Sequence, residues 1–82
     1  MITYFVVQSF TLGSRGAYIA DDPVPATGAE HARRLAERLA ASKVGVIAFS
    51  RSGDPATGEF EDATVLFMSG DLPTDMQEEL AA

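Results

Sequence analysis

The chain of 82 residues has no cysteine and no tryptophan, a single histidine, and no basic residue after position 51. The absence of cysteine excludes disulfide frameworks and thiolate metal sites. One histidine without a spaced set of carboxylates does not make a zinc site, so we expect neither a metal nor a cofactor. A small domain that folds without such cross-links is typical of a reducing cytoplasm.

Long hydrophobic runs are also absent. No apolar stretch approaches the roughly 20 residues that span a bilayer, and the first residues lack the basic and apolar regions of a secretory signal. We therefore expect a cytoplasmic protein without membrane association. The length indicates one domain, residues 1–82, which on folding removes roughly 60% of its unfolded surface from water.

Charge is unevenly distributed along the chain. All six basic residues lie before position 52, whereas eight of the twelve acidic residues lie after position 51. The formal net charge of −6 opposes binding to phosphate backbones, which requires clustered Lys and Arg. We therefore expect no nucleic-acid partner.

Two strands are predicted before the first helix. Residues 2–12 are rich in β-branched and aromatic side chains, which favour a strand. The turn residues 13–16 follow, and residues 17–20 return as a short second strand. Pro23 and Pro25 end this strand, because proline lacks an N–H and restricts the preceding residue. They lead through a loop to the helix.

The main helix is predicted over Thr27 to Ser42. Thr27 and Glu30 have the spacing of a capping box, in which each side chain accepts from the backbone N–H of the other residue. Small and apolar residues recur at helical spacing and form one stripe, which suits close packing against a sheet. The stripe consists of Ala29, Ala32, Leu35, Ala36, Leu39 and Ala40.

A second hairpin is predicted around the turn at residues 54–58, where Asp54, Pro55 and Gly58 have strong turn preferences. If this turn sets the register, Asp54 faces Glu59. Every later pair then follows without a break, including Phe49 opposite Thr64, Ile47 opposite Leu66 and Gly45 opposite Met68.

Together these elements predict an α+β fold. We expect an antiparallel sheet of about four strands in the chain order β-β-α-β-β, with the helix Thr27 to Ser42 packed on one face and a short C-terminal helix. The capping-box spacing of Thr74 and Gln77 supports the last helix, and Leu72, Met76 and Leu80 would line one side of it.

The predicted register makes both faces of the second hairpin apolar. One face carries Val46, Ala48, Val65 and Phe67, and the other carries Ile47, Phe49, Leu66 and Met68. One helix covers only one face, so the other needs the C-terminal segment, a curled sheet or a second molecule. We expect a homodimer through this face or an edge strand.

No catalytic residues are predicted. His31 lies at the border of the apolar stripe, and the hydroxyl of Ser42 is too far along the helix axis to serve as its nucleophile. The candidate partner-contact residues are of two kinds. The apolar ones are Ile47, Phe49, Leu66 and Met68, and the basic ones, which could dock an acidic partner, are Arg33, Arg34 and Arg38.

Three sequence stretches resemble a group of short uncharacterised bacterial proteins. The stretches are V-Q-S-F at 7–10, A-R-R-L-A-E-R-L-A at 32–40, and G-V-I-A-F-S-R-x-G-D-P-x-x-G at 45–58. This resemblance covers most of the chain but implies no activity. A weaker similarity is to the SPOR peptidoglycan-binding modules, which begin with a V-Q-x-x-x-F strand, then an Ala-rich helix and a hairpin. Here Phe10 follows Gln8 after one residue, and a proline-rich loop precedes the helix.

Two functional hypotheses follow. The first is a non-catalytic interaction or regulatory module that self-associates. The second is a small module that binds a glycan, as the similarity to SPOR modules implies, or another polar ligand, and that uses the sheet face carrying Tyr4, Tyr18 or Phe49. An enzyme ranks third, because no arrangement of reactive side chains is recognisable.

Overall fold

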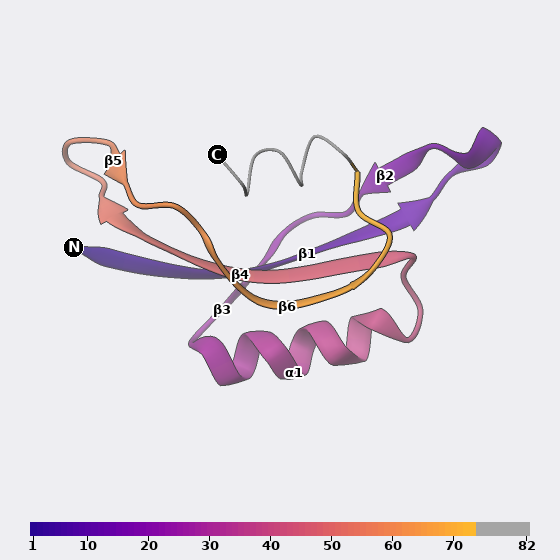
Figure 1. Cartoon of the computed structure of the whole chain (residues 1–82), viewed down its shortest axis with the longest axis horizontal. Helices are drawn as coiled ribbons and strands as arrows, with labels where there is room; N and C mark the ends of the chain where they lie inside the picture. The colour runs from indigo at the N-terminus through magenta and orange to yellow at the C-terminus, as the bar shows by residue number, and fades with distance from the viewer. Residues whose placement is uncertain (74–82) are drawn as a thin grey trace.

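The computed structural model describes residues 1–73. It is an α+β fold with one helix, α1, and one antiparallel sheet (Figure 1). Its elements in chain order are β1 (Ile2–Leu12), a short 3-10 turn η1 (Ser14–Gly16), β2 (Tyr18–Ala20), β3 (Val24–Ala26), α1 (Ala29–Ala40), β4 (Gly45–Asp54), β5 (Glu59–Phe60) and β6 (Thr64–Gly70).

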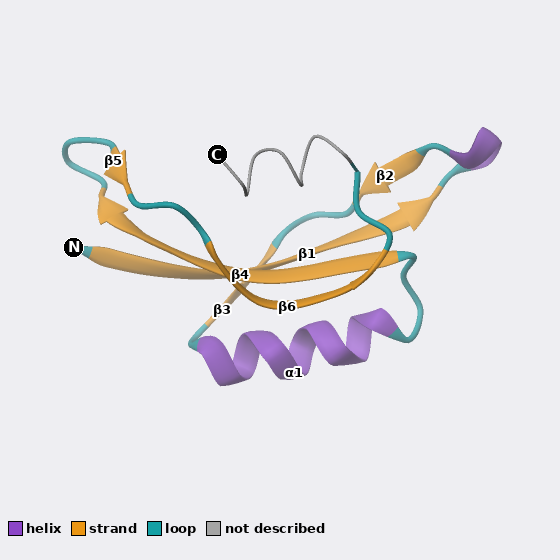
Figure 2. Cartoon of the chain, viewed as in Figure 1, coloured by secondary structure: helices purple, strands orange, loops and turns teal. Residues whose placement is uncertain are grey.

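The sheet is built on two long central strands, β1 and β4, which pair antiparallel from Ile2 opposite Gly53 to Phe10 opposite Gly45. Strands β2 and β3 both pair with β1, and strands β5 and β6 both pair with β4. One edge of the sheet is therefore formed by β2 and β3, and the other by β5 and β6 (Figure 2). The expected antiparallel sheet and single main helix are confirmed, but the described part of the chain has six strands instead of about four.

Strand β3 was not expected, because it contains Pro25. It pairs with β1 through Val24 opposite Val7 and Ala26 opposite Phe5. Proline is tolerated at this position because an edge strand needs no N–H directed outward. Residues 21–23, which belong to no strand, separate β2 from β3, although the backbone N–H of Asp21 still donates to the carbonyl oxygen of Ser9 in β1.

Helix α1 begins at Ala29, and the predicted capping box does not form. The N-cap residue is Gly28, which makes no side-chain capping bond. Instead the backbone N–H of Thr27 donates to Nδ1 of His31 at 3.1 Å, and the Thr27 hydroxyl lies 3.2 Å from the same nitrogen. The single histidine of the chain thus organises the start of the helix.

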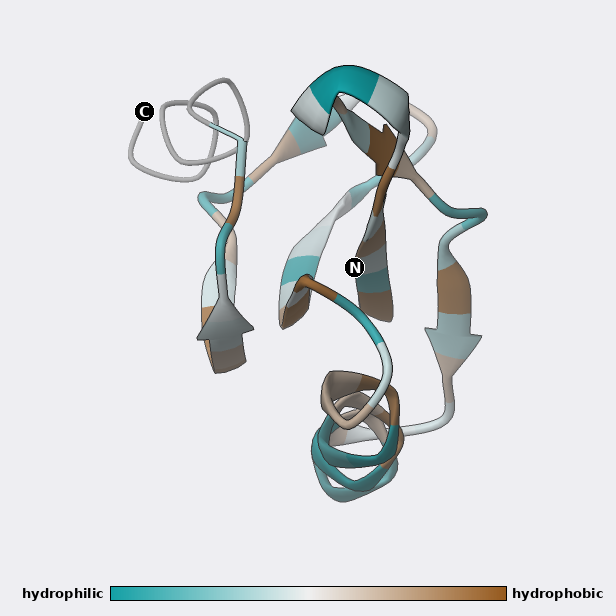
Figure 3. Ribbon diagram, turned by 90° about the vertical axis from the view of Figure 1, so that its right-hand side faces the viewer, coloured by the Kyte–Doolittle hydropathy of each residue, from teal (hydrophilic) through white to brown (hydrophobic). Residues whose placement is uncertain are grey.

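The alanine stripe of α1 packs on one face of the sheet, which we call the helix face. Ala32 and Ala36 are fully buried against Val7, Val46 and Ala48. Figure 3 shows the helix against one side of the sheet, with its hydrophilic surface turned away from the strands. Small side chains allow the helix axis to approach the sheet closely, as the sequence predicted.

The register of the second hairpin is right at the turn and wrong beyond it. Asp54 faces Glu59 and Gly53 faces Phe60, as expected. The strand then breaks at residues 61–63, and a bulge between Ala48 and Phe49 shifts the register again. The remaining pairs are therefore displaced from the predicted ones, as in Phe49 opposite Val65, Ile47 opposite Met68 and Gly45 opposite Gly70.

These shifts change which side chains share a face. Leu66 has no partner in the register and packs on the helix-face cluster, so its predicted place beside Ile47 and Met68 is wrong. Val65, predicted on the helix face, lies opposite Phe49 and points to the other side of the sheet. The bulge accounts for both corrections, because one extra residue exchanges inward and outward positions.

The sheet face opposite α1, here called the second face, has a core of its own. Phe10 and Ile47 are buried there, and Leu72 packs on both of them. Leu72, which follows β6, thus covers one part of this face. Cover by residues after the second hairpin was one of the three expected ways to bury it. The predicted helix from Thr74 onward lies outside the described residues.

No helix within residues 1–73 is long and apolar enough to cross a lipid bilayer.

Candidate functional site

The strongest candidate for a functional surface is the uncovered part of the second face. Strand alternation places several apolar residues there, and we call five of them the open patch: Tyr4, Phe49, Phe60, Val65 and Met68. Met68 is 59% exposed, Val65 46% and Tyr4 44%. In Figure 1 both ends of the sheet bend away from α1, so that the second face is concave.

Aromatic and cationic contacts order one end of the open patch. The rings of Tyr4 and Phe60 lie 6.0 Å apart with an angle of 37° between their planes. The guanidinium of Arg51 lies 5.8 Å from the centre of the Phe60 ring, and its Nε donates to the carbonyl oxygen of Glu61 at 2.9 Å. Such an arrangement of rings and a cation suits contacts with planar or apolar groups.

The Phe60 ring lies directly over Gly53. A Cβ atom at position 53 would overlap the ring, so only glycine permits this contact. Gly53 therefore lets the Phe60 ring lie close to the β4 backbone at the edge of the open patch.

The apolar candidate residues from the sequence divide between different environments. Phe49 and Met68 belong to the open patch, and Met68 is its most exposed member. Ile47 is fully buried under Phe10 and Leu72, and therefore does not present a surface for a partner. Leu66 packs toward α1. Of the four apolar candidates, two therefore lie in the open patch, and their role in partner contact stays a prediction.

The basic candidate residues lie on the exposed side of α1. Arg33 contacts Glu30 at 3.6 Å, and its Nε donates to the carbonyl oxygen of Leu66 at 3.4 Å. Arg34 and Arg38 flank Glu37 around a shallow surface depression. An acidic residue therefore lies within each part of this basic surface, which reduces its positive potential.

A polar cluster that the sequence reasoning missed joins β1 to the end of α1 and to the segment after β2. The carboxylate of Asp21 accepts from the Ser9 hydroxyl at 2.9 Å and from the Thr11 hydroxyl at 3.1 Å. It also pairs with Nζ of Lys43 at 3.2 Å, and the backbone N–H of Asp21 donates to the Ser9 carbonyl. Gln8 Nε2 donates to the Asp21 carbonyl oxygen.

These contacts lower the pKa of Asp21 below its ordinary value of 3.8, mainly through the Ser9 hydrogen bond. Partial desolvation raises it, and Lys43 and Thr11 lower it further. Every hydroxyl of the cluster donates to the carboxylate, so none is activated as a nucleophile. The one available sequence signal was the spacing of Ser9 and Thr11, which places both hydroxyls on the same side of a strand.

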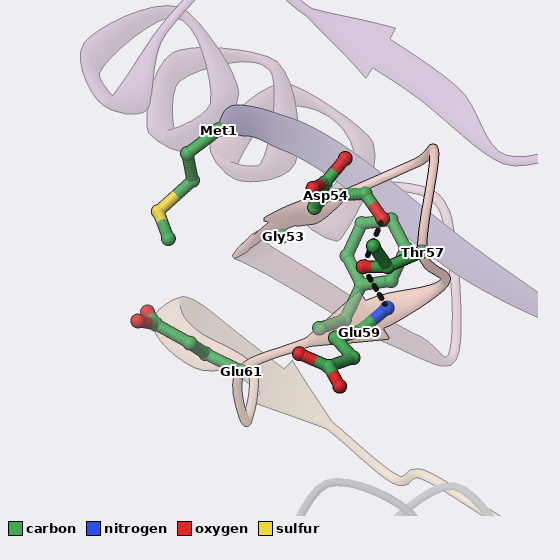
Figure 4. A pocket seen from close by; sticks show the side chains of 7 residues that line it. Met1, Gly53, Asp54, Thr57, Glu59 and Glu61 are labelled. Atoms are coloured by element: carbon green, nitrogen blue, oxygen red, sulfur yellow. Dashed lines mark hydrogen bonds between the residues drawn. The ribbon is translucent and has the colours of Figure 1, made fainter.

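A hollow beside the β4–β5 turn collects three carboxylates, from Asp54, Glu59 and Glu61 (Figure 4). The turn itself uses part of this set, because Asp54 Oδ1 accepts from the backbone N–H of Ala56 at 2.9 Å. Across residues 1–73, no group of three or more potential ligand side chains is placed to hold a metal ion.

His31, the only candidate base considered from the sequence, accepts at Nδ1 from the backbone N–H of Thr27. This contact gives the ring a structural role at the start of α1, on the side of the molecule away from the open patch.

Comparisons of this chain with protein-family models, with curated proteins and with solved structures found no match. The resemblances to the short bacterial proteins and to SPOR modules stay predictions from the sequence.

Proposed function

We propose that this chain is a small non-catalytic interaction module that self-associates through the open patch. The observation that carries the proposal is the exposure of Tyr4, Val65 and Met68 together on one sheet face, joined through Phe49. Large exposed apolar patches on soluble proteins often mark sites of protein–protein interaction. Contact between the same patch on two copies forms a closed pair with two-fold symmetry.

Val65 gives the sharpest test, because the chain contains a matched control. Val24 is also an exposed valine in an edge strand, but it lies opposite Val7 and therefore on the helix-face side of the sheet. We expect the unaltered chain to form dimers at tens of micromolar in sedimentation velocity. Val65→Lys then abolishes the dimer, because it places a charge in the buried contact, whereas Val24→Lys leaves it intact.

A monomeric mass for the unaltered chain throughout this concentration range contradicts the proposal. Equal loss of dimer in both lysine variants also contradicts it, because the effect would then not depend on the open patch. A salt series separates the apolar contact from docking through Arg33, Arg34 and Arg38, since an electrostatic contact weakens as salt rises.

The second candidate is a ligand-binding module for a glycan or another polar molecule. Its support is the group formed by Tyr4, Phe60 and Arg51, in which two rings and a guanidinium lie at the end of a concave face. Sedimentation with insoluble peptidoglycan tests this function. Retention of the unaltered chain and its loss in Tyr4→Ala favours ligand binding, and the absence of retention excludes this glycan.

A further inference from the structure

Two opposite charges lie on the second face, near the two ends of the central strand β4. Arg51 is exposed and lies opposite Tyr4 of β1, so both side chains belong to this face. At the other end, a Cβ atom at position 45 would overlap the carbonyl oxygen of Asp71. Positions 45 and 51 share a face of β4, because side chains alternate along a strand. The backbone of Asp71 therefore crosses the second face at the start of β4.

Neither charge has an ion-pair partner within residues 1–73. The guanidinium of Arg51 lies over the Phe60 ring and donates to the backbone of Glu61, but it contacts no carboxylate among these residues. Asp71 is exposed, and its backbone N–H donates to the carbonyl oxygen of Val44 at 2.9 Å. Its carboxylate forms no ion pair in the described part of the chain. The second face thus carries a positive charge at one end and a negative charge at the other.

The open patch extends between these two charges. Arg51 lies six residues along β4 from position 45, which corresponds to about 20 Å. The midpoint is position 48, and Val65 and Met68 lie on either side of it, opposite Phe49 and Ile47. A two-fold axis across the strands at this midpoint exchanges the places of the two charges. It also exchanges the places of Val65 and Met68.

Two second faces that pack on each other have two regular alignments, because stacked sheets keep their strands within about 30° of each other. If the β4 strands of the two copies run antiparallel, Arg51 of each copy lies over Asp71 of the other. Val65 of each copy then lies over Met68 of the other. If the β4 strands run parallel, Arg51 lies over Arg51, and the acidic hollows beside the two β4–β5 turns also come together.

Charge and apolar contact both favour the antiparallel alignment. It joins opposite charges twice, whereas the parallel alignment brings like charges together, which is unfavourable. The parallel alignment also places Met68 over Gln8, because Gln8 faces Ile47 from β1. The antiparallel alignment instead places Met68 on the apolar side chain of Val65. Charges at the rim of an interface contribute little to its affinity, but they fix its orientation.

We propose that two copies pair with their β4 strands antiparallel, and that Arg51 of each copy contacts the carboxylate of Asp71 of the other. This inference rests on the proposed function, because it specifies how a second copy occupies the open patch. The apolar centre around Val65 and Met68 supplies the affinity, and the two charged contacts at the rim select the orientation.

Charge reversal in the full chain tests the contact. We expect Arg51→Glu and Asp71→Arg each to raise the dissociation constant of the dimer by about tenfold in sedimentation velocity. The reason is that each contact occurs twice in a two-fold pair and becomes repulsive in both places. An equimolar mixture of the two variants should restore the original constant, since both contacts of the mixed pair again join opposite charges. Failure of the mixture to recover the dimer overturns the inference.

Arg34→Glu is the matched control for Arg51→Glu. It makes the same change in charge on the exposed side of α1, away from the second face. We expect this variant to leave the dissociation constant unchanged. An increase equal to that of Arg51→Glu overturns the inference, because net charge and not the position of the charge would then explain the effect.

A second readout reports the alignment without altering either charge. The chain has no cysteine, so Ala56→Cys in the exposed β4–β5 turn gives a single attachment point for a nitroxide. This chain is mixed with isotopically labelled chain that carries no nitroxide, at a concentration at which both are dimeric. We expect broadening of the amide signals of Gly70 and Asp71. Broadening of Glu59 and Phe60 instead, or of neither pair, overturns the inference.

The outcomes separate this inference from the proposed function. If the unaltered chain is monomeric at tens of micromolar, the proposed function fails and the alignment fails with it. If the chain dimerises and Val65→Lys abolishes the dimer, the proposed function stands. In that case, the absence of any effect of charge reversal, together with broadening of Glu59 and Phe60, excludes the antiparallel alignment alone.

Discussion

The two faces of the sheet differ in what covers them, although the same strands supply both. On the helix face, α1 brings Ala32 and Ala36 against Val46 and Ala48, and all four are fully buried. On the second face, among residues 1–73, Leu72 covers Phe10 and Ile47, whereas Met68, which lies opposite Ile47, is mostly exposed. Alternation along a strand decides which residues share a face, but whether that face is buried depends on elements from elsewhere in the chain.

The largest expected effect distinguishes the covered and open parts of the second face. Ile47→Ala should lower the free energy of unfolding by about 2–4 kcal/mol, because Ile47 is fully buried and leaves a cavity. Met68→Ala, at the paired position, should cost less than about 0.5 kcal/mol because its side chain is exposed. Urea denaturation of both variants measures the difference, and equal costs would show that Met68 is also covered.

The next effect tests how closely α1 approaches the helix face. Ala36→Leu should destabilise the protein by about 1–3 kcal/mol, because no space exists for the larger side chain. Ala41→Leu, just beyond the helix and exposed, is the control and should change the stability little. Thermal unfolding followed by circular dichroism compares the two. A stabilising Ala36→Leu variant would mean that the helix is free to move away from the sheet.

A smaller effect is expected in the polar cluster. Ser9→Ala should cost about 1 kcal/mol, because the buried hydroxyl loses its hydrogen bond to Asp21 while the carboxylate regains water. Ser14→Ala, at an exposed position, should have no measurable effect. Equal midpoints of urea unfolding for both variants would assign no energetic role to the Ser9 contact.

Beyond the turn at Asp54, the second hairpin shows where prediction from sequence ends. The bounds of β1 follow from its β-branched and aromatic residues, and the Asp54–Glu59 pair follows from turn chemistry. The later register does not. Arg51 takes the carbonyl oxygen of Glu61 as an acceptor, where β5 has already ended, and the bulge then shifts Val65 and Leu66. These events depend on contacts across the strands, which local propensity does not encode.

The candidate site was predictable to a similar degree. Alternation indicated an apolar second face, and it correctly included Phe49 and Met68. It did not reveal that Leu72 covers Ile47, because that contact joins distant parts of the chain. The cluster around Asp21 was missed for the same reason, since Lys43 and Ser9 meet Asp21 only after the sheet and helix have formed.

The smallest expected effect is a pH dependence confined to acid. The pKa of Asp21 is lowered in the folded protein, so its contribution to stability is complete above the ordinary value of 3.8 and is lost as the pH falls through the lower folded pKa. We expect Asp21→Asn to be less stable near neutral pH and to lose less stability between pH 4 and pH 2. Urea midpoints across this range measure the slope. If the urea midpoints of the unaltered chain and of Asp21→Asn fall in parallel as the pH is lowered, carboxyl groups other than Asp21 determine the loss of stability in acid.

Each edge of the sheet is formed by two separate strands, and this affects how the protein assembles at high concentration. Strands β2, β3 and β5 are two or three residues long, and the free edge of β6 is interrupted at Leu66, whose carbonyl oxygen accepts from Arg33. Fibril growth requires a long, regular edge that templates backbone pairing with the next molecule. The described edges offer no such template. Assemblies of this protein are therefore expected to be finite and joined by side chains, and not to propagate as cross-β polymers.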